Sequence, residues 1–235
     1  MDQSVSQQTL AEMKDYYRAR AGEYDQWFYR QGRYDRGAQN NQKWFAECDE
    51  VLRALHHAQL TGDILELACG TGIWTQHLVH HSSSMMAVDA SAEVIKINRQ
   101  KVGDNRVEYV QADLFAWKPP RRFDAVFFGF WLSHVPIENL QSFWTTVGKS
   151  LQPDGKVYFV DSLCSKTSGA SNHQHASDGQ LQHRKLDDGR EYRIVKVFYE
   201  PREIEIAAAQ AGIRMNIHRT SEYFLYGSGT KSTYS

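Results

Sequence analysis

The chain has 235 residues and a formal net charge of -1, and hydrophobic residues make up 41% of it. This composition suits one packed α/β domain, and the near-neutral charge argues against the broad basic surface of a nucleic-acid-binding protein. No apolar run approaches the roughly 20 residues that span a bilayer, and the start lacks the pattern of a secretory signal. The cysteines are too few and too scattered for a zinc site. We therefore expect a cytoplasmic protein with no metal and no nucleic-acid or membrane partner.

The first segment, residues 1–58, is expected to form a helical cap. Trp44, Cys48, Val51 and Leu55 recur in it at helical spacing. The segment before them is rich in tyrosine and tryptophan, which is unusual for a helix that faces solvent. The mouth of a cofactor site is one surface on which these rings could pack.

Residues 62–161 alternate between short apolar strands and amphipathic helices, and we expect them to form a cofactor-binding core. The strand signals are DILELA, MMAVDA, RVEYVQAD, RFDAVFFGFWL and KVYFVD. A helix is expected over GIWTQHLVHH, another after Ser91 as its N-cap, and a third over IENLQSFWTTVGKSL, closed by QPDG. This alternation predicts βαβ units, a parallel sheet and right-handed crossovers.

The rest of the chain reads as two further parts of the same domain. Residues 162–199 are expected to supply an acceptor loop, rich in Ser, Gly, Asn and His, and a hairpin that turns at Asp188 and Gly189. Residues 200–235 predict a helix with Pro201 in its first turn, followed by the strands RMNIHRT and EYFLYG. The sheet is therefore expected to finish with an antiparallel strand.

The strongest local signal is ELACGTG, residues 66–72, which follows the first strand and opens a helix. Glycines there let the backbone turn tightly and let a ligand approach closely. The dinucleotide fingerprint is incomplete, because Trp74 and Thr75 stand where its last glycine should come. The loop therefore favours a ligand that lacks a pyrophosphate.

Two carboxylates follow at the ends of the next two strands. Asp89 lies about 20 residues beyond the glycines, the spacing at which an acidic residue can accept hydrogen bonds from ribose hydroxyls. Asp113 ends the third strand and can accept from an adenine amino group, with Leu114 and Phe115 beside the ring. Each carboxylate alone could be a helix cap or a turn residue, and the order of the motifs favours the ligand role.

The order ELACGTG, VDAS, QADLF, FDAVFF and LQPDGKVYFVD resembles the class I S-adenosylmethionine-dependent methyltransferases. The resemblance implies a Rossmann-like, mostly parallel seven-stranded sheet with helices on both faces, N-terminal helices, and an added β-hairpin over the active site. It implies S-adenosylmethionine as the cofactor, with its methionine part on the glycine loop, its ribose on Asp89 and its adenine on Asp113. The residues expected to bind the cofactor are Tyr17, Tyr24, Glu66, Ala68, Gly70, Thr71, Gly72, Trp74, Asp89, Ala90, Ser91, Asp113, Leu114, Phe115 and Phe128.

A closer resemblance extends over nearly the whole chain. YYRARAGEYD, GIWT, VFFGFWLSHVP and DDGREYRIVKVF are similar to the phosphonate O-methyltransferases of dehydrophos biosynthesis. This resemblance implies methylation of an acidic oxygen, with Arg184 and Lys196 holding the acid. The chain departs from the pattern by an extra stretch around RQGRYDRG and a longer loop around SGASNHQHASDG.

Other functions stay open at this stage. His134 follows the fourth strand and could act as a base for N- or C-methylation of an apolar natural product, or it could be a structural hydrogen-bonding residue. Arg184 and Lys196 could be solvated strand residues. A regulator that binds the cofactor without turnover is a further alternative. The sequence does not determine the acceptor, the methylated atom, the oligomeric state or the pathway.

Overall fold

The computed structural model describes residues 4–170 and 177–233. Its main sheet has seven strands in the order β3-β2-β1-β4-β5-β10-β9, and β10 runs antiparallel to both of its neighbours. The strands are β1 (Gly62–Leu67), β2 (Ser82–Asp89), β3 (Val107–Gln111), β4 (Phe123–Gly129), β5 (Leu151–Ser162), β9 (Ile213–Arg219) and β10 (Phe224–Lys231). The expected Rossmann-like sheet with an antiparallel end is confirmed.

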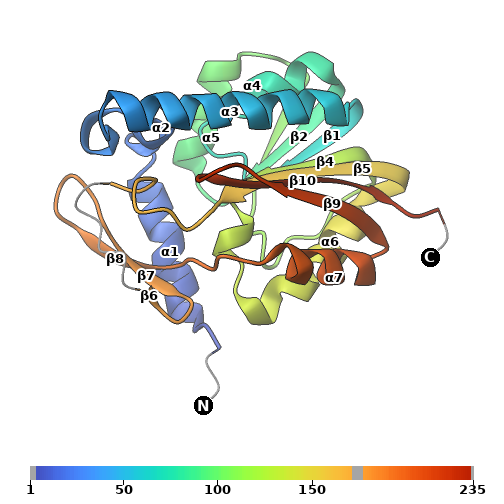
Figure 1. The fold of residues 1–235 in the computed structure, drawn as a ribbon. Helices are drawn as coiled ribbons and strands as arrows, with labels where there is room; N and C mark the ends of the chain where they lie inside the picture. Colours follow the sequence, from blue (N-terminus) through green and yellow to red (C-terminus); the bar gives the residue numbers. More distant parts are fainter. Residues whose placement is uncertain (1–3, 171–176, 234–235) are drawn as a thin grey trace.

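Helices cover both faces of this sheet, with α3 on one side and α6 and α7 on the other (Figure 1). The α-helices are α1 (Gln7–Ala19), α2 (Tyr24–Phe28), α3 (Ala38–Ala58), α4 (Thr75–Leu78), α5 (Ala92–Val102), α6 (Leu140–Ser150) and α7 (Pro201–Gln210). Short 3-10 turns are η1 (Gly32–Tyr34), η2 (Val79–His81), η3 (Leu132–His134) and η4 (Ile137–Asn139). Across the described part of the chain, no helix has both the length and the apolar character needed to cross a membrane.

Two helix starts follow from their capping residues. The Ser91 side chain accepts a hydrogen bond from the Val94 N–H and caps α5, as expected. At the start of α7, Glu200 and Glu203 form a capping box, and Pro201 occupies the first turn.

The structure differs from the expected elements in two places. The helix predicted over GIWTQHLVHH is reduced to α4 and η2, so the chain after the glycines stays non-helical up to Thr75. QPDG does not form a separate turn, because β5 begins at Leu151, directly after α6. The strand accommodates an irregular register there, with Asp154 in the left-handed region at φ 60°.

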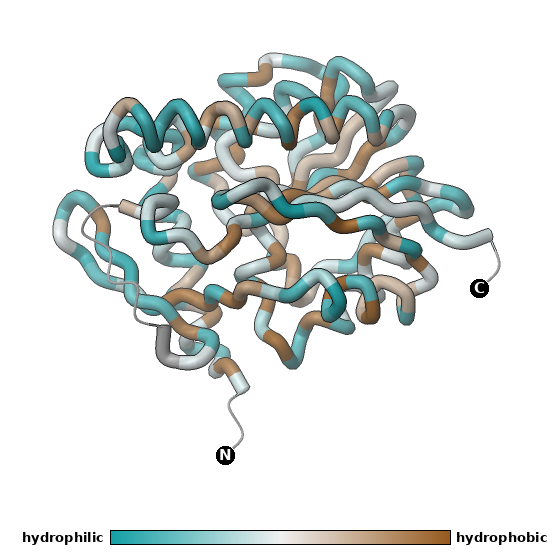
Figure 2. The backbone as a smooth tube through the Cα atoms, in the orientation of Figure 1, coloured by the Kyte–Doolittle hydropathy of each residue, from teal (hydrophilic) through white to brown (hydrophobic). Residues whose placement is uncertain are grey.

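Each face of the sheet buries its own hydrophobic cluster. Trp44 and Val51 of α3 pack with Ile64 on one face, while Trp144 of α6 and Ile204 of α7 pack with other strand residues on the opposite face. Figure 2 shows hydrophobic residues along the central strands and largely hydrophilic residues along the hairpin. The apolar strands therefore form the rigid support for the site.

A third cluster joins α1 to the predicted hairpin, β7 (Leu181–Lys185) and β8 (Glu191–Val195), with the short β6 (Ser177–Asp178) beside it. Leu10 and Met13 of α1 pack there against Ile194 of β8. We refer to α1 with this three-stranded sheet as the cap. Residues 171–176 of the expected acceptor loop lie outside the described residues.

Glu47 of α3 holds the turn between β9 and β10. Its buried carboxylate accepts hydrogen bonds from the Thr220 hydroxyl, the Ser221 hydroxyl (2.6 Å) and the Tyr223 N–H (2.8 Å). A single charged acceptor therefore satisfies several donors and fixes α3 against the end of the sheet.

We expect Glu47→Ala to lower the free energy of unfolding by about 3 kcal/mol, because it leaves several donors without their charged acceptor. Glu50→Ala is the matched control on the same helix, since among the described residues the Glu50 carboxylate accepts one hydrogen bond, from the Tyr226 hydroxyl at 3.2 Å. Urea denaturation followed by circular dichroism measures both. Equal losses in the two variants would contradict this role of Glu47.

Candidate active site

The glycine loop after β1 opens a cavity at the carboxyl end of the sheet. Gly70 has φ +52°, and a Cβ placed on it would meet no atom within 4 Å, so its backbone borders open space. Gly72 has φ +89°, and a Cβ there would lie 2.8 Å from Asn98, so it serves close packing of the loop on α5. Glycine is therefore required at these two positions for different reasons: Gly70 borders open space, and Gly72 allows close packing on α5.

Asp89 fixes the shape of this loop. Its carboxylate accepts the Gly70 N–H at 3.0 Å and the Ser91 N–H at 2.9 Å, one on each oxygen. Burial raises the pKa of Asp89, and these backbone hydrogen bonds oppose that shift. A carboxylate has further lone pairs, so Asp89 can still accept from a ligand hydroxyl.

Asp113 lies in the same cavity, which has a volume of about 80 Å³. It accepts the Phe115 N–H at 3.1 Å and pairs with Lys14 of α1 at 2.9 Å, so the cap closes over this end. The aromatic rings of Phe115 and Trp131 form part of the cavity wall, with their centroids 5.4 Å apart. Of the residues predicted to bind the cofactor, those lining this cavity are Tyr17, Tyr24, Ala68, Gly70, Asp89, Ala90, Ser91, Asp113, Leu114 and Phe115.

The remaining predicted residues do not line this cavity. Glu66 is buried and accepts the Thr75 hydroxyl at 2.6 Å, and burial raises its pKa to about 8. Thr71 donates its hydroxyl to Asp25 of α2 at 2.5 Å. Gly72 packs on α5, and the buried Trp74 ring packs against the rings of neighbouring core residues.

Phe128 requires a correction, because the structure places it away from the cavity. It is fully buried on the face of the sheet that α6 and α7 cover. The centroid of its ring lies 5.1 Å from that of Phe143 and 5.7 Å from that of Trp144. Strand β4 continues to Gly129, and the cavity begins beyond the strand end, where Phe130 lies. In this segment it is Phe130, and not Phe128, that lines the cavity.

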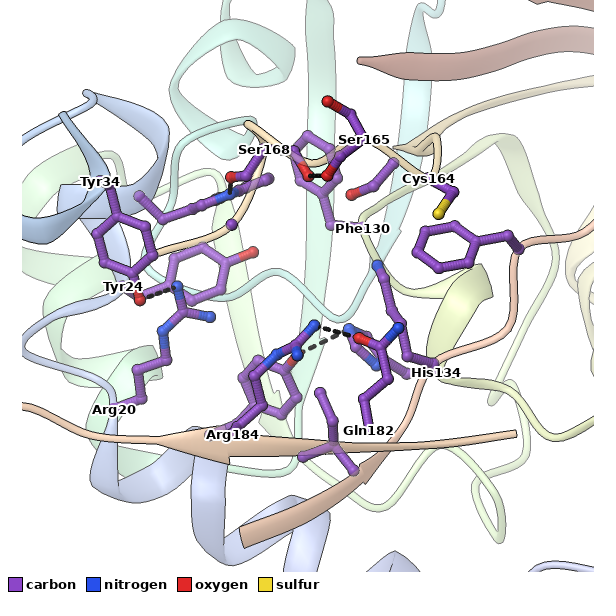
Figure 3. A pocket seen from close by; sticks show the side chains of 17 residues that line it. Arg20, Tyr24, Tyr34, Phe130, His134, Cys164, Ser165, Ser168, Gln182 and Arg184 are labelled. Atoms are coloured by element: carbon purple, nitrogen blue, oxygen red, sulfur yellow. Dashed lines mark hydrogen bonds between the residues drawn. The ribbon is translucent and has the colours of Figure 1, made fainter. Parts of the chain in front are cut away.

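A second cavity of about 100 Å³ adjoins the first and contains three cationic side chains. Arg20 of α1 is buried among the rings of Tyr16, Tyr24 and Tyr34, and its Nη2 donates to the Tyr34 hydroxyl at 3.1 Å. Arg184 of β7 donates to Gln182 at 2.5 Å (Figure 3). Within the described residues, neither arginine forms an ion pair.

The third cation is Lys196, just after β8. Its ammonium donates to the Ser133 hydroxyl at 2.8 Å and lies 3.7 Å from Asp161 at the end of β5. Burial lowers the pKa of Lys196 to about 8, opposed by Asp161 and reinforced by Arg184 and Arg20. This carboxylate is partly satisfied by the backbone, since it also accepts the N–H groups of Ser133 and Ser162.

His134 borders both cavities and joins the cap to the core. Its Nδ1 lies 2.7 Å from the Val195 carbonyl, and its Nε2 lies 2.7 Å from the Tyr17 hydroxyl. Burial and then the nearby Lys196 hold the pKa of His134 well below its usual range, so the ring is neutral at pH 7.

The fold and this geometry agree with the comparisons to known proteins. Residues 64–155 match the family model described as "Methyltransferase domain". The structure of DhpI in complex with SAH superposes with a TM-score of 0.78 at 34% identity, covering 97% of this chain and 99% of that one. The chain belongs to the class I S-adenosylmethionine-dependent methyltransferases. A DhpI complex with SAM and HEP matches equally well, over 96% of this chain and 99% of that one, with the same identity and TM-score.

Curated relatives match over shorter stretches. Malonyl-[acyl-carrier protein] O-methyltransferase of Priestia megaterium is 31% identical over 101 residues, 41% of this methyltransferase and 35% of the relative. Trans-aconitate 2-methyltransferase of Azoarcus sp. is 38% identical over 66 residues, 27% of this chain and 25% of that relative. The methyltransferase thus spans about a third or less of the length of these relatives.

The first cavity fits S-adenosylmethionine on the evidence of its own residues. Two carboxylates, Asp89 and Asp113, are available to hydroxyl and amino donors, and aromatic walls can flank a flat ring. Space is open beside Gly70. Lys14, the one cation among the lining residues of this cavity in the described chain, is already paired with Asp113, which suits a ligand without phosphates.

The structure also shows site residues that the sequence did not single out. Arg20 and Gln182 line the second cavity, and Asp161 with Ser133 supports Lys196. Arg20 lies within YYRARAGEYD, a segment that carried the family resemblance, so a signal for it was present. Ser133 lies within VFFGFWLSHVP, which also carried the resemblance, whereas Gln182 has no local signal, because its role depends on how the hairpin packs.

Proposed function

We propose that this methyltransferase transfers the methyl group to an oxygen of a small acid, a phosphonate or a carboxylate. The observation that carries the proposal is the positive charge that lines the second cavity, where Arg20 and Lys196 are buried and Arg184 is half-buried. Arg20 and Arg184 lack ion-pair partners within the described chain, and Lys196 has only Asp161 nearby. Buried cations of this kind are stabilised when an anion binds.

The cofactor contacts proposed for this chain follow the first cavity. Asp89 would accept hydrogen bonds from the ribose, and Asp113 from the adenine amino group. The backbone around Gly70 and Gly72 would meet the methionine part. Lys14 and Tyr17, both on α1, would close the cap over the bound cofactor, since both line this cavity.

The size of the second cavity favours a small acceptor. Its volume is about 100 Å³. Arg184 would hold the acid oxygens through its planar fork, and Lys196 would hold them as a point charge. Arg20 supplies a third cation, available to the acid or to the carboxylate of the cofactor.

An acid acceptor needs no catalytic base. When bound, S-adenosylmethionine supplies a methyl group on a positively charged sulfur. The ionised acid oxygen forms the new C–O bond as the C–S bond breaks, and no proton has to leave. The protein then aligns the two reactants and excludes water, and both effects contribute strongly to the rate of a displacement of this kind.

The geometry of His134 argues against the alternative in which it serves as a base. Its Nε2, the nitrogen on the cavity side, already pairs with the Tyr17 hydroxyl. Burial, and then the nearby cations, lower the pKa of His134, and a weaker base removes a proton less readily. N- or C-methylation of an apolar natural product therefore has less support than O-methylation of an acid.

The names of the relatives also support an acidic acceptor. One is a malonyl-[acyl-carrier protein] O-methyltransferase and another a trans-aconitate 2-methyltransferase. DhpI has been captured with SAM and HEP together, so a related chain holds a cofactor and a second small molecule at once.

We expect Arg184→Gln to raise KM for the acid about tenfold to a hundredfold, because it removes a charge-assisted contact to the bound anion. Methylation of methylphosphonate, acetate and malonate, followed by mass spectrometry, provides the assay. Arg190→Gln is the matched control on the same hairpin, since Arg190 is paired with Asp188 and lies outside the cavity. Unchanged KM in Arg184→Gln, or methylation of none of the acids, would contradict the proposal.

The pKa of Lys196, about 8, gives a pH dependence with a defined sign. The ammonium is charged below that pH and loses its proton above it, so kcat/KM for the acid should fall as pH rises through about 8. Lys196→Arg keeps its charge across this range, and its profile should stay flat. A wild-type profile that is flat to pH 10 would show that the charge on Lys196 does not bind the acceptor.

A further inference from the structure

Arg30 holds the segment that forms one wall of the second cavity. Its guanidinium is buried against the Trp44 ring, with the central carbon 4.5 Å from the ring centroid. Two of its nitrogens donate to successive backbone carbonyls, those of Thr167 at 2.6 Å and Ser168 at 3.0 Å. Ser168 and Gly169 line the second cavity, whereas Arg30 is not part of its lining. Arg30 therefore contacts this wall without bordering the cavity itself.

These contacts determine where the N–H groups of the same peptide units point. A trans peptide unit is planar, so its N–H points opposite to its C=O. The carbonyls of Thr167 and Ser168 face Arg30, so the N–H groups of Ser168 and Gly169 point away from it. Neither N–H has a hydrogen-bond partner among the described residues. Successive N–H groups without internal partners are an arrangement that binds anions in proteins.

The cost of keeping Arg30 in this place indicates that its side chain is needed. Arg30 has φ 54°, in the left-handed region that arginine rarely adopts. Within the described chain it forms no ion pair and its Nε has no partner, and burial lowers its pKa to about 10. Its contacts with the two carbonyls and the Trp44 ring offset this cost. A cation on those carbonyls also polarises the peptide units, which strengthens their N–H groups as donors.

We propose that the Ser168 and Gly169 N–H groups face the second cavity and form a second anion site there, positioned by Arg30, and that the acceptor is a diacid. This inference rests on the proposed function and refines its substrate class. Figure 3 shows Ser168 and Arg184 on different sides of the cavity, so the amides and the cations form separate sites. The acid group beside Arg184 and Lys196 receives the methyl group, and the other group stays ionised on the amides.

The test compares each diacid with its own monomethyl ester, which has the same acid chain and one ionised group fewer. Malonate, succinate, glutarate and phosphonoacetate (esterified at its carboxyl group) form the series, and mass spectrometry counts the methyl groups added. We expect kcat/KM for the best diacid to exceed that of its monoester by about tenfold or more, because the amides bind a carboxylate more strongly than a neutral ester. The reaction should therefore stop at the monomethyl ester.

Arg30→Gln separates positioning of the amides from a general structural role. It should lower kcat/KM for the diacid about tenfold, through KM, and leave kcat/KM for the monoester within about twofold. Arg36→Gln is the matched control, because it removes a hydrogen bond of 3.3 Å to the neighbouring Lys166 carbonyl and should leave the preference unchanged. Gly169→Pro removes one of the two N–H groups and Gly169→Ala keeps it, so of these two variants the proline variant alone should lose the preference.

Equal kcat/KM for diacid and monoester in the wild-type protein, or accumulation of dimethyl esters, would overturn the diacid site and leave O-methylation of acids in place. The same conclusion follows if folded Arg30→Gln lowers kcat/KM for both substrates alike. Methylation of neither substrate would contradict the proposed function, and the diacid site with it. The ester comparison needs no variant, so it decides the question even where Arg30→Gln does not fold.

Discussion

Positive charge gathered in a small, partly enclosed space is the constraint around which the second cavity is arranged. Three cations share it with a single nearby carboxylate, Asp161. The structure tolerates this charge through tyrosine rings around Arg20, the Gln182 amide at Arg184, and a lowered pKa at Lys196. A bound anion would pair with these cations, so the same repulsion between like charges would favour binding of an acid.

The two cavities differ in the charge of the side chains that line them. Asp89 and Asp113 line the first cavity, and Arg20, Arg184 and Lys196 line the second. Neutral groups, among them Tyr17 and His134, stand between them. The cap supplies residues to both cavities, because Tyr17 of α1 borders each and the hairpin carries Arg184. Binding of either ligand is therefore linked to the position of the cap.

The sequence predicted the features that local chemistry determines. The glycine loop and Asp89 lie where a parallel strand must end, and their spacing alone places them at one edge of the sheet. Phe128 was assigned to the cofactor because the aromatic run FFGF does not show where the strand stops. Gln182 was missed because the packing of α1 on the hairpin brings together residues more than 150 positions apart. Contacts of that range leave no local pattern.

The most direct test of the account is transfer of a ¹³C-labelled methyl group from S-adenosylmethionine to a panel of small acids, followed by NMR. The panel pairs each acid with its amide or alcohol analogue, for example malonate with malonamide and methylphosphonate with ethanol. The account predicts labelled methyl esters from the ionised acids and no labelled product from the neutral partners. Labelled N-methyl or C-methyl products from neutral compounds, with the acids unreacted, would contradict it.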